Sequence, residues 1–253
     1  MDLGIAGRRA LVCGASAGIG FGCAQVLAAE GCEVIMVARD PGRLDAAVTQ
    51  VPGARGVVAD LGEDGVEARL RDAAGPVDIL VTNPGVSPAG SLTDAATVMD
   101  ATRSVPAQTM ALIGAFLPGM RAAGWGRVVN ITSSGVFASG AALGLSGAVR
   151  ATLTHMAASL AQEVAADGIT VNCIAPGPVD TAGLQHFVER RARETGQSVA
   201  EVRAARLASL PTRRFSEPAE VGALCAFLAS SLAANITGRT VLADGGANAY
   251  PFL

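Results

Sequence analysis

Ser146 and Arg150 lie four residues apart in the stretch GLSGAVRATLTH (144–155). On a helix this spacing puts both side chains on the same face, so a hydroxyl and a guanidinium can act together. Arginine donates hydrogen bonds and keeps its positive charge, but it does not release a proton in proteins. A serine hydroxyl is a weak acid. The pair can therefore hold ligand oxygens or stabilise an oxyanion, but it cannot relay protons.

A second group with recognisable chemistry is the glycine-rich turn in RALVCGASAGIGFG (9–22). Gly14, Gly18 and Gly20 follow an apolar run and precede a helical stretch. A turn of this kind directs backbone N–H groups and the positive end of a helix toward a pyrophosphate, and the missing side chains allow a close approach. The pattern predicts a dinucleotide site; the alternative is an ordinary tight turn that happens to contain three glycines.

The end of the next apolar run, VIMVARDPGRL (34–44), indicates which dinucleotide is preferred. In a dinucleotide site this position meets the adenosine ribose, where an acid accepts hydrogen bonds from a 2′-hydroxyl and a base binds a 2′-phosphate. Ala38 stands at the position of the acid, and Arg39 follows it with a planar guanidinium that suits phosphate. We therefore expect NADP(H) in preference to NAD(H); the alternative is that Arg39 only covers the adenine.

These candidate residues need a scaffold, and short apolar runs separated by helical stretches indicate one. Near-continuous apolar strands between helices are typical of a parallel sheet buried on both faces and built from βαβ units. We expect an α/β fold: a single-domain, doubly wound, Rossmann-type sheet of about seven strands with helices on both faces. The predicted strands are residues 9–13, 33–38, 56–59, 77–82, 127–132, 169–175 and 239–243.

The helical pattern is broken in one region. Helices are predicted over 18–30, 143–166 and 218–230, with end signals in glycine and proline. The segment of about 176–211 interrupts the alternation and holds a polar, charged helix pair. We expect one dinucleotide-binding domain over residues 1–253, in which this segment is a mobile cover over a substrate site.

Composition excludes several classes of protein. The 253 residues carry a net charge of −3 and the arginines are interleaved with acids, which argues against nucleic-acid binding. No apolar run approaches the ~20 residues that cross a bilayer, and the N-terminus has no signal-peptide core, so we expect a cytoplasmic protein without a membrane partner. Two histidines and five cysteines without C-x-x-C spacing predict no metal site and buried thiols.

The chain resembles the short-chain dehydrogenase/reductase family over nearly its full length. The resemblance is carried by CGASAGIG (13–20), ADL (59–61), TNPG (82–85), NITSS (130–134), VNCIAPGPVDT (171–181) and the stretch 214–246. It implies a nicotinamide cofactor, a small or medium carbonyl or alcohol substrate of the 3-oxoacyl kind, and a homo-oligomer, specifically a tetramer. The cofactor-binding residues that it implies are Gly14, Ser16, Gly18, Ile19, Gly20, Arg39, Asp60, Leu61, Asn83, Gly85, Arg150, Pro176, Gly177, Val179 and Thr181.

The catalytic positions depart from the pattern of this family. Its members use a serine, a tyrosine as general acid or base, a lysine one helical turn later, and an asparagine on the preceding helix. Ser133 matches the serine, but the tyrosine position, 13 residues on, holds Ser146, and the lysine position holds Arg150. The asparagine position falls at Val105 or Ser104, and the chain contains no lysine. The resemblance therefore implies an atypical catalytic set of Ser133, Ser146 and Arg150.

Four other side chains are candidates for the missing acid. His155 is predicted to face away from Ser146 on the helix, and His186 lies in the expected cover. Tyr250 is the single tyrosine and lies close to the C-terminus. Asp180 follows the P-G motif, where its alternative role is to start or cap a helix of the cover.

We therefore expect an atypical NADP(H)-dependent short-chain oxidoreductase. Two alternatives stay open on the sequence. One is a non-redox enzyme of the same fold, such as an isomerase, dehydratase or cyclase. The other is a catalytically inactive nucleotide-binding subunit. Net hydride transfer separates the first alternative from the oxidoreductase, and turnover of any carbonyl separates the second.

Overall fold

The computed structural model describes residues 1–85, 90–138 and 144–248; Tyr250 lies outside these ranges. Across the described residues, seven strands form one sheet in the order β3-β2-β1-β4-β5-β6-β7, and every neighbouring pair is parallel. The order reverses between β1 and β4, as in a doubly wound sheet, so the predicted fold class is confirmed. The strands are β1 (Arg9–Cys13), β2 (Glu33–Ala38), β3 (Arg55–Val58), β4 (Ile79–Thr82), β5 (Gly126–Ile131), β6 (Ile169–Pro176) and β7 (Thr240–Ala243).

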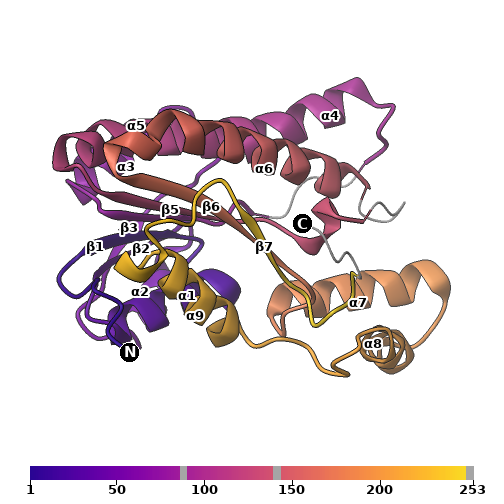
Figure 1. Cartoon of the computed structure of the whole chain (residues 1–253). Coiled ribbons are helices and arrows are strands. Elements are labelled where there is room, and N and C mark those ends of the chain that lie inside the picture. The colour runs from indigo at the N-terminus through magenta and orange to yellow at the C-terminus, as the bar shows by residue number, and fades with distance from the viewer. Residues whose placement is uncertain (86–89, 139–143, 249–253) are drawn as a thin grey trace.

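Helices cover both faces of the sheet (Figure 1). One face carries α1 (Gly18–Ala29), α2 (Pro41–Val48) and α9 (Pro218–Leu228). The other carries α3 (Val66–Ala74), α5 (Gln108–Ala123) and α6 (Gly144–Val164), with α4 (Ala95–Thr102) leading into α5 through a π-helical turn, η1 (Arg103–Ala107). No helix within the described ranges is long and apolar enough to cross a bilayer.

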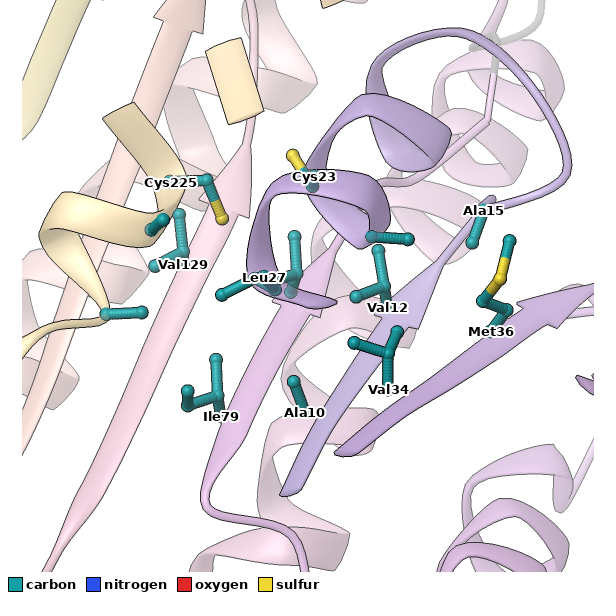
Figure 2. Close-up of a cluster of buried hydrophobic side chains, with 14 of the residues drawn as sticks. Ala10, Val12, Ala15, Cys23, Leu27, Val34, Met36, Ile79, Val129 and Cys225 are labelled. Atoms are coloured by element: carbon teal, nitrogen blue, oxygen red, sulfur yellow. The ribbon is translucent and has the colours of Figure 1, made fainter. Parts of the chain in front are cut away.

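Strand β1 shows why the sheet is buried on both sides. Successive side chains of a strand point to opposite faces. Ala10 and Val12 therefore join the cluster beneath α1 and α9, which Figure 2 shows, while Leu11 and Cys13 join the cluster beneath α5 and α6. All five cysteines are buried free thiols, as predicted, and burial raises the pKa of the Cys13 thiol to about 12. They act as small apolar side chains.

Helix α1, whose N-terminus follows the glycine-rich turn, is held against α9 by a pair of glycines. A Cβ atom on Gly222 would lie 2.5 Å from the backbone oxygen of Gly22, and one on Gly22 would lie 2.5 Å from the Pro218 backbone. Such distances are shorter than any ordinary contact. The two helix backbones therefore touch, and neither position accepts a larger residue without moving a helix.

We expect Gly222→Ala to lower the free energy of unfolding by about 1–3 kcal/mol, because the added methyl group overpacks this contact. Gly114→Ala in α5 is the control, since a Cβ atom there meets nothing within 4 Å. That change is expected to be neutral or to stabilise by about 0.5–1 kcal/mol. Urea denaturation of both variants measures the difference, and equal effects at the two positions would contradict the close contact.

The segment from which we expected a cover forms α7 (Ala182–Thr195) and α8 (Val199–Ala208), which lie together beyond the end of β6 (Figure 1). The two helices share a small apolar cluster that includes Val188 and Phe215. An ion pair between Arg203 and Asp180, with a distance of 3.0 Å, ties α8 to the segment that precedes α7. The Arg203 guanidinium also lies 4.8 Å from the centre of the Phe215 ring.

The predicted capping role of Asp180 is wrong. Thr181 is the N-cap of α7, and its Oγ1 accepts a hydrogen bond from the Leu184 N–H at 3.3 Å. Asp180 instead uses both carboxylate oxygens to bind Arg203. The ion pair is favoured because the Arg203 guanidinium of α8 donates to both carboxylate oxygens of Asp180. A helix cap would engage only one of these oxygens.

Candidate active site

The predicted site residues come together at the carboxyl edge of the sheet. In open α/β sheets this edge, near the point where the strand order reverses, is where ligands bind. The structure places each predicted residue directly after a strand or in the helix that follows it: Gly14 after β1, Arg39 after β2, Asp60 and Leu61 after β3, Asn83 and Gly85 after β4, Ser133 after β5, Gly177, Val179 and Thr181 after β6, with Pro176 as the last residue of β6.

The turn between β1 and α1 requires its glycines. Gly14 and Gly18 have φ angles of +63° and +59°, in the left-handed region that glycine adopts readily. A Cβ atom on Gly20 would lie 2.4 Å from the Gly14 oxygen. Half-buried Ser16 lies in the turn, and Ile19 in the first turn of α1 packs against the apolar core. These five predicted cofactor residues therefore lie in the turn after β1 or in the first helical turn of α1.

Within the part of the chain that the structure describes, no side chain caps the N-terminus of α1, so its first backbone N–H groups are available to a ligand. Its N-cap residue is Ala17, which offers no side-chain acceptor, and its first turn contains no acidic residue. The first N–H groups of a helix need an acceptor, and the positive end of the helix dipole favours an anion. A phosphate group is the chemistry that this arrangement fits.

The wall opposite the glycine-rich turn comes from the segment after β6. A Cβ atom on Gly18 would lie 3.3 Å from Thr181 Cγ2, so the N-cap of α7 faces the turn. The Gly177 N–H donates to the Ala243 oxygen at 2.9 Å, and a Cβ atom on Gly177 would lie 2.7 Å from Asp244 Cα. Val179 is buried beside Ser216. The P-G segment is thereby fixed against β7 while Thr181 reaches the turn.

A cavity of about 230 Å³ lies at the ends of β2, β3 and β4 and is closed by η1 and α5. Arg39 lies at one side of the cavity and is exposed; among the described residues no carboxylate binds it. The neighbouring acid, Asp40, is engaged as the N-cap of α2, where it accepts from the Arg43 N–H at 2.9 Å. Asp60 Oδ1 accepts from the Gly62 N–H at 2.9 Å. The Arg39 guanidinium is therefore the positive charge that this cavity offers to a ligand.

Ser146 and Arg150 form a directly bonded pair in α6. Arg150 Nη1 donates to Ser146 Oγ at 2.7 Å, and Arg150 Nη2 donates to the Gly85 oxygen at 3.0 Å. Burial lowers the pKa of the Arg150 guanidinium from its ordinary value, but arginine stays protonated in proteins. The structure thus confirms that the two side chains share one helix face, and it links them to the loop after β4.

Ser133 lies beside a turn that packs against the helix of this pair. Its Oγ accepts from the Gly135 N–H at 3.1 Å, in the short turn η2 (Ser134–Val136). A Cβ atom on Gly147 would lie 2.9 Å from the Gly135 oxygen, so this turn packs against the first turn of α6. Ser133 and Ser146 therefore both lie close in sequence to the contact between Gly135 and Gly147. Ser133 follows β5, and Ser146 belongs to α6.

The predicted asparagine position contains no amide. Val105 is buried in an apolar cluster with Leu145 and Val149 of α6, and Ser104 Oγ donates to the Ala101 oxygen at 3.4 Å. Both belong to the π-helical turn η1, which therefore packs against the helix that carries Ser146 and Arg150 without adding an amide to them.

Three of the four candidate substitute acids lie in the described residues, and none of these three is hydrogen-bonded to Ser146 or Arg150. His155 and His186 are exposed on α6 and α7, and Asp180 is bound to Arg203. Within the described ranges, neither Ser146 nor Arg150 is hydrogen-bonded to a carboxylate or an imidazole. The side chains that the structure brings together are thus two hydroxyls and a guanidinium.

One side chain of the cavity was missed from the sequence. Gln108, the first residue of α5, lines the cavity, and its Nε2 atom is buried without a hydrogen-bond partner among the described residues. The signal was present, because Leu112 and Phe116 follow at helical spacing and are buried. A polar residue on this apolar stripe is the feature that could have indicated a ligand contact.

Comparisons with known proteins agree with this geometry. A family model described as enoyl-(acyl carrier protein) reductase matches residues 14–248. The dehydrogenase/reductase SDR family member 4 of Oryctolagus cuniculus is 33% identical, over 96% of this chain and 94% of the relative. The 3-oxoacyl-[acyl-carrier-protein] reductase of Vibrio harveyi is 32% identical, over 96% of this chain and 98% of the relative.

A solved structure of L-sorbose reductase from Gluconobacter frateurii, complexed with NADPH and L-sorbose, superposes with a TM-score of 0.90. It is 27% identical, and the match covers 99% of this chain and 100% of that one. Identity, coverage and fold thus agree along the whole sequence. The chain belongs to the short-chain dehydrogenase/reductase family of oxidoreductases.

Proposed function

We propose that the chain is an NADP(H)-dependent oxidoreductase that interconverts a carbonyl and an alcohol by means of Ser133, Ser146 and Arg150. One observation carries the proposal. Each serine oxygen accepts a hydrogen bond from a fixed N–H, Ser133 from Gly135 N and Ser146 from Arg150 Nη1. The hydroxyl proton of each serine is therefore left to donate, and both can donate to the oxygen of one substrate carbonyl.

The residues around the glycine-rich turn fit a dinucleotide. The uncapped N-terminus of α1 suits a pyrophosphate, and the unpaired Arg39 suits a 2′-phosphate. When bound, a nicotinamide dinucleotide supplies or accepts a hydride. Gly14, Asp60, Asn83 and the other predicted cofactor residues would hold it, and the complex of the sorbose reductase with NADPH supports this choice of cofactor.

The catalytic work of the protein side chains is electrostatic. As hydride reaches the carbonyl carbon, negative charge develops on the oxygen, and two fixed hydroxyl donors stabilise it. The Arg150 charge acts through its bond to Ser146, which makes that hydroxyl a better donor. Neither serine nor arginine releases a proton near neutral pH, so the proton of the product alcohol comes from water.

This arrangement favours a particular class of substrate. Without a strong acid, the alkoxide must be stabilised by its own substituents, so an electron-poor carbonyl such as a 3-oxoacyl group is the expected type. The similarity to a 3-oxoacyl reductase supports the same class. We propose that residues 1–253 form one dinucleotide-binding domain, and that 176–211, with α7 and α8, covers this small or medium substrate.

We further propose that the enzyme is a cytoplasmic homo-oligomer, a tetramer as the family resemblance implies. Large apolar side chains are exposed on several elements: Met99 is 72% exposed, Leu232 is 54% exposed and Phe227 is 36% exposed. A second copy of the chain would cover such residues. The five free thiols suit a reducing compartment.

Ser146→Ala and Arg150→Met test the catalytic assignment. Loss of the Ser146 hydroxyl is expected to lower kcat/KM for carbonyl reduction on the order of tenfold, because one donor to a charged oxygen is removed. Arg150→Met is expected to lower it further and to weaken NADPH binding. The measurement is consumption of NADPH with a panel of 3-oxo esters and simple ketones, beside fluorescence titration with NADPH and NADH.

Thr152→Ala is the matched control, since its hydroxyl is exposed on the same helix and bonds only to the Ala148 oxygen. If both site variants keep full turnover, the catalytic assignment is wrong. Conversion of a substrate without net change in NADPH would point to a non-redox enzyme. Tight NADPH binding with no turnover of any carbonyl would point to an inactive subunit.

A further inference from the structure

We propose that Gln108 is a recognition residue for the adenine base of the cofactor. The inference rests on the proposed function, because it needs a nicotinamide–adenine dinucleotide to bind at the carboxyl edge of the sheet. It assigns a role to a side chain that belongs neither to the glycine-rich turn nor to the Ser133, Ser146 and Arg150 set.

The cavity beside Arg39 has the volume and lining for one heteroaromatic ring. Its volume is about 230 Å³, and Leu61, Val105 and Leu112 supply apolar surface. Asp60 and Gln108 supply polar groups from two different elements, the loop after β3 and the start of α5. A mostly apolar pocket with a few placed polar groups is typical of a small-molecule site.

The carboxamide of Gln108 is the unexplained group in this cavity. Its Nε2 atom is buried, and in the described part of the chain nothing accepts its hydrogens. Buried polar atoms are nearly always hydrogen-bonded, because an unsatisfied one is destabilising. Gln108 is half-buried and lies one helical turn before buried Leu112 on α5. A ligand atom that accepts a hydrogen bond in this cavity would satisfy the amide.

Two of the neighbouring polar groups already have hydrogen-bond partners. Thr82 Oγ1 donates to Asn130 Oδ1 at 2.6 Å across the ends of β4 and β5. Asp60 Oδ1 accepts from Gly62 N in its own turn. The second oxygen of Asp60 can therefore accept a hydrogen bond from a ligand, and Gln108 Nε2 can donate one.

An adenine ring matches this pair. Its edge carries an amino group that donates and ring nitrogens that accept, and its faces are apolar. A carboxylate accepts only, so Asp60 suits the amino group, whereas Gln108 Nε2 suits a ring nitrogen. Glutamine is a side chain that pairs with adenine in other recognition sites for the same reason. The base would lie between the 2′-phosphate contact of Arg39 and the helix start at Gln108.

Gln108→Leu and Gln108→Met test the proposal, because both keep the side-chain volume and remove the amide. We expect the Kd of 2′,5′-ADP and of NADPH to rise on the order of tenfold in both variants, while the Kd of reduced nicotinamide mononucleotide, which has no adenine, stays unchanged. We also expect the Tm of the ligand-free variants to rise, since a buried unpaired amide has been removed. Calorimetric titration and thermal unfolding of the full chain measure these quantities.

The opposite pattern would overturn the proposal. A structural role for Gln108 predicts a lower Tm in the variants and unchanged or generally weakened binding of all three ligands. Gln50→Leu is the control, because Gln50 is exposed at the end of α2 and its amide donates to the Ala46 oxygen at 2.9 Å. If the native chain binds none of the three ligands, the proposed function fails and this inference with it; binding that is equal in native and Gln108 variants removes the inference alone.

Discussion

Replacing Ser146 by tyrosine and Arg150 by lysine in one chain (S146Y/R150K) is expected to raise kcat for carbonyl reduction by about 10²–10⁴-fold, the contribution of a positioned general acid. The two positions share one face of α6, and the structure already brings their side chains within hydrogen-bond distance. A phenol at position 146 would give a proton to the developing alkoxide, which a serine cannot do. The measurement is steady-state NADPH consumption with an electron-poor ketone.

The pH dependence of the same pair of proteins gives an independent readout. In the native chain, kcat for reduction is expected to be flat from about pH 6 to pH 9, because serine stays neutral and arginine stays charged over that range. In S146Y/R150K the acid must be protonated to act in reduction. Its rate is therefore expected to fall as the pH rises through the pKa of the new tyrosine, which the adjacent lysine charge lowers.

The single variants S146Y and R150K serve as controls. The two residues are in contact, so their effects are expected to be non-additive, and the gain of the double variant should exceed the product of the two single gains. A double variant that binds NADPH with native affinity, gains no rate and keeps a flat profile would show that position 146 does not face the reacting carbonyl. A native profile with a clear titration near neutral pH would reveal an acid other than Ser146.

The scaffold could be predicted because it follows from local patterns. Each strand is a short apolar run, and residues such as Leu11 and Val12 are buried whichever face they point to. Because both faces of the sheet are buried, such a strand can be recognised as a nearly continuous apolar run. Several strand boundaries differ from the prediction by one or two residues. For example, β4 begins at Ile79 and not at Val77, and Asp78, just before it, accepts a hydrogen bond from the Arg9 N–H at 2.9 Å through its side-chain Oδ2.

The site could be predicted only where a motif is contiguous. The glycine-rich turn and the Ser146–Arg150 pair depend on spacings of a few residues, and the structure contains both as predicted. Contacts between distant segments could not be derived in this way. Asp180 was expected to cap a helix, yet it binds Arg203, 23 residues later, because the angle between α7 and α8 decides that contact. Gln108 was missed since its environment is made by three strand ends.

Arg39→Ala is expected to weaken NADPH binding by about 10- to 100-fold and to leave NADH binding nearly unchanged. A hydrogen bond to a charged group contributes about 1.5–3 kcal/mol, and each 1.4 kcal/mol is a factor of ten in Kd. Arg39 is exposed, lines the cavity at the end of β2, and is bound to no carboxylate among the residues that the structure describes, so its charge is available to a 2′-phosphate. Fluorescence titration with both cofactors at fixed ionic strength measures the ratio.

Arg43→Ala is the matched control for this prediction. Arg43 is exposed on α2, four residues from Arg39, so its removal changes the net charge and the long-range field by a similar amount without touching the cavity. If Arg39→Ala weakens NADPH and NADH equally, the side chain covers the adenine and does not read the phosphate. If Arg43→Ala has the same effect as Arg39→Ala, the preference arises from general electrostatic attraction. Only a loss confined to Arg39 and to NADPH supports a specific phosphate contact, and it would locate the adenosine half of the cofactor beside Gln108.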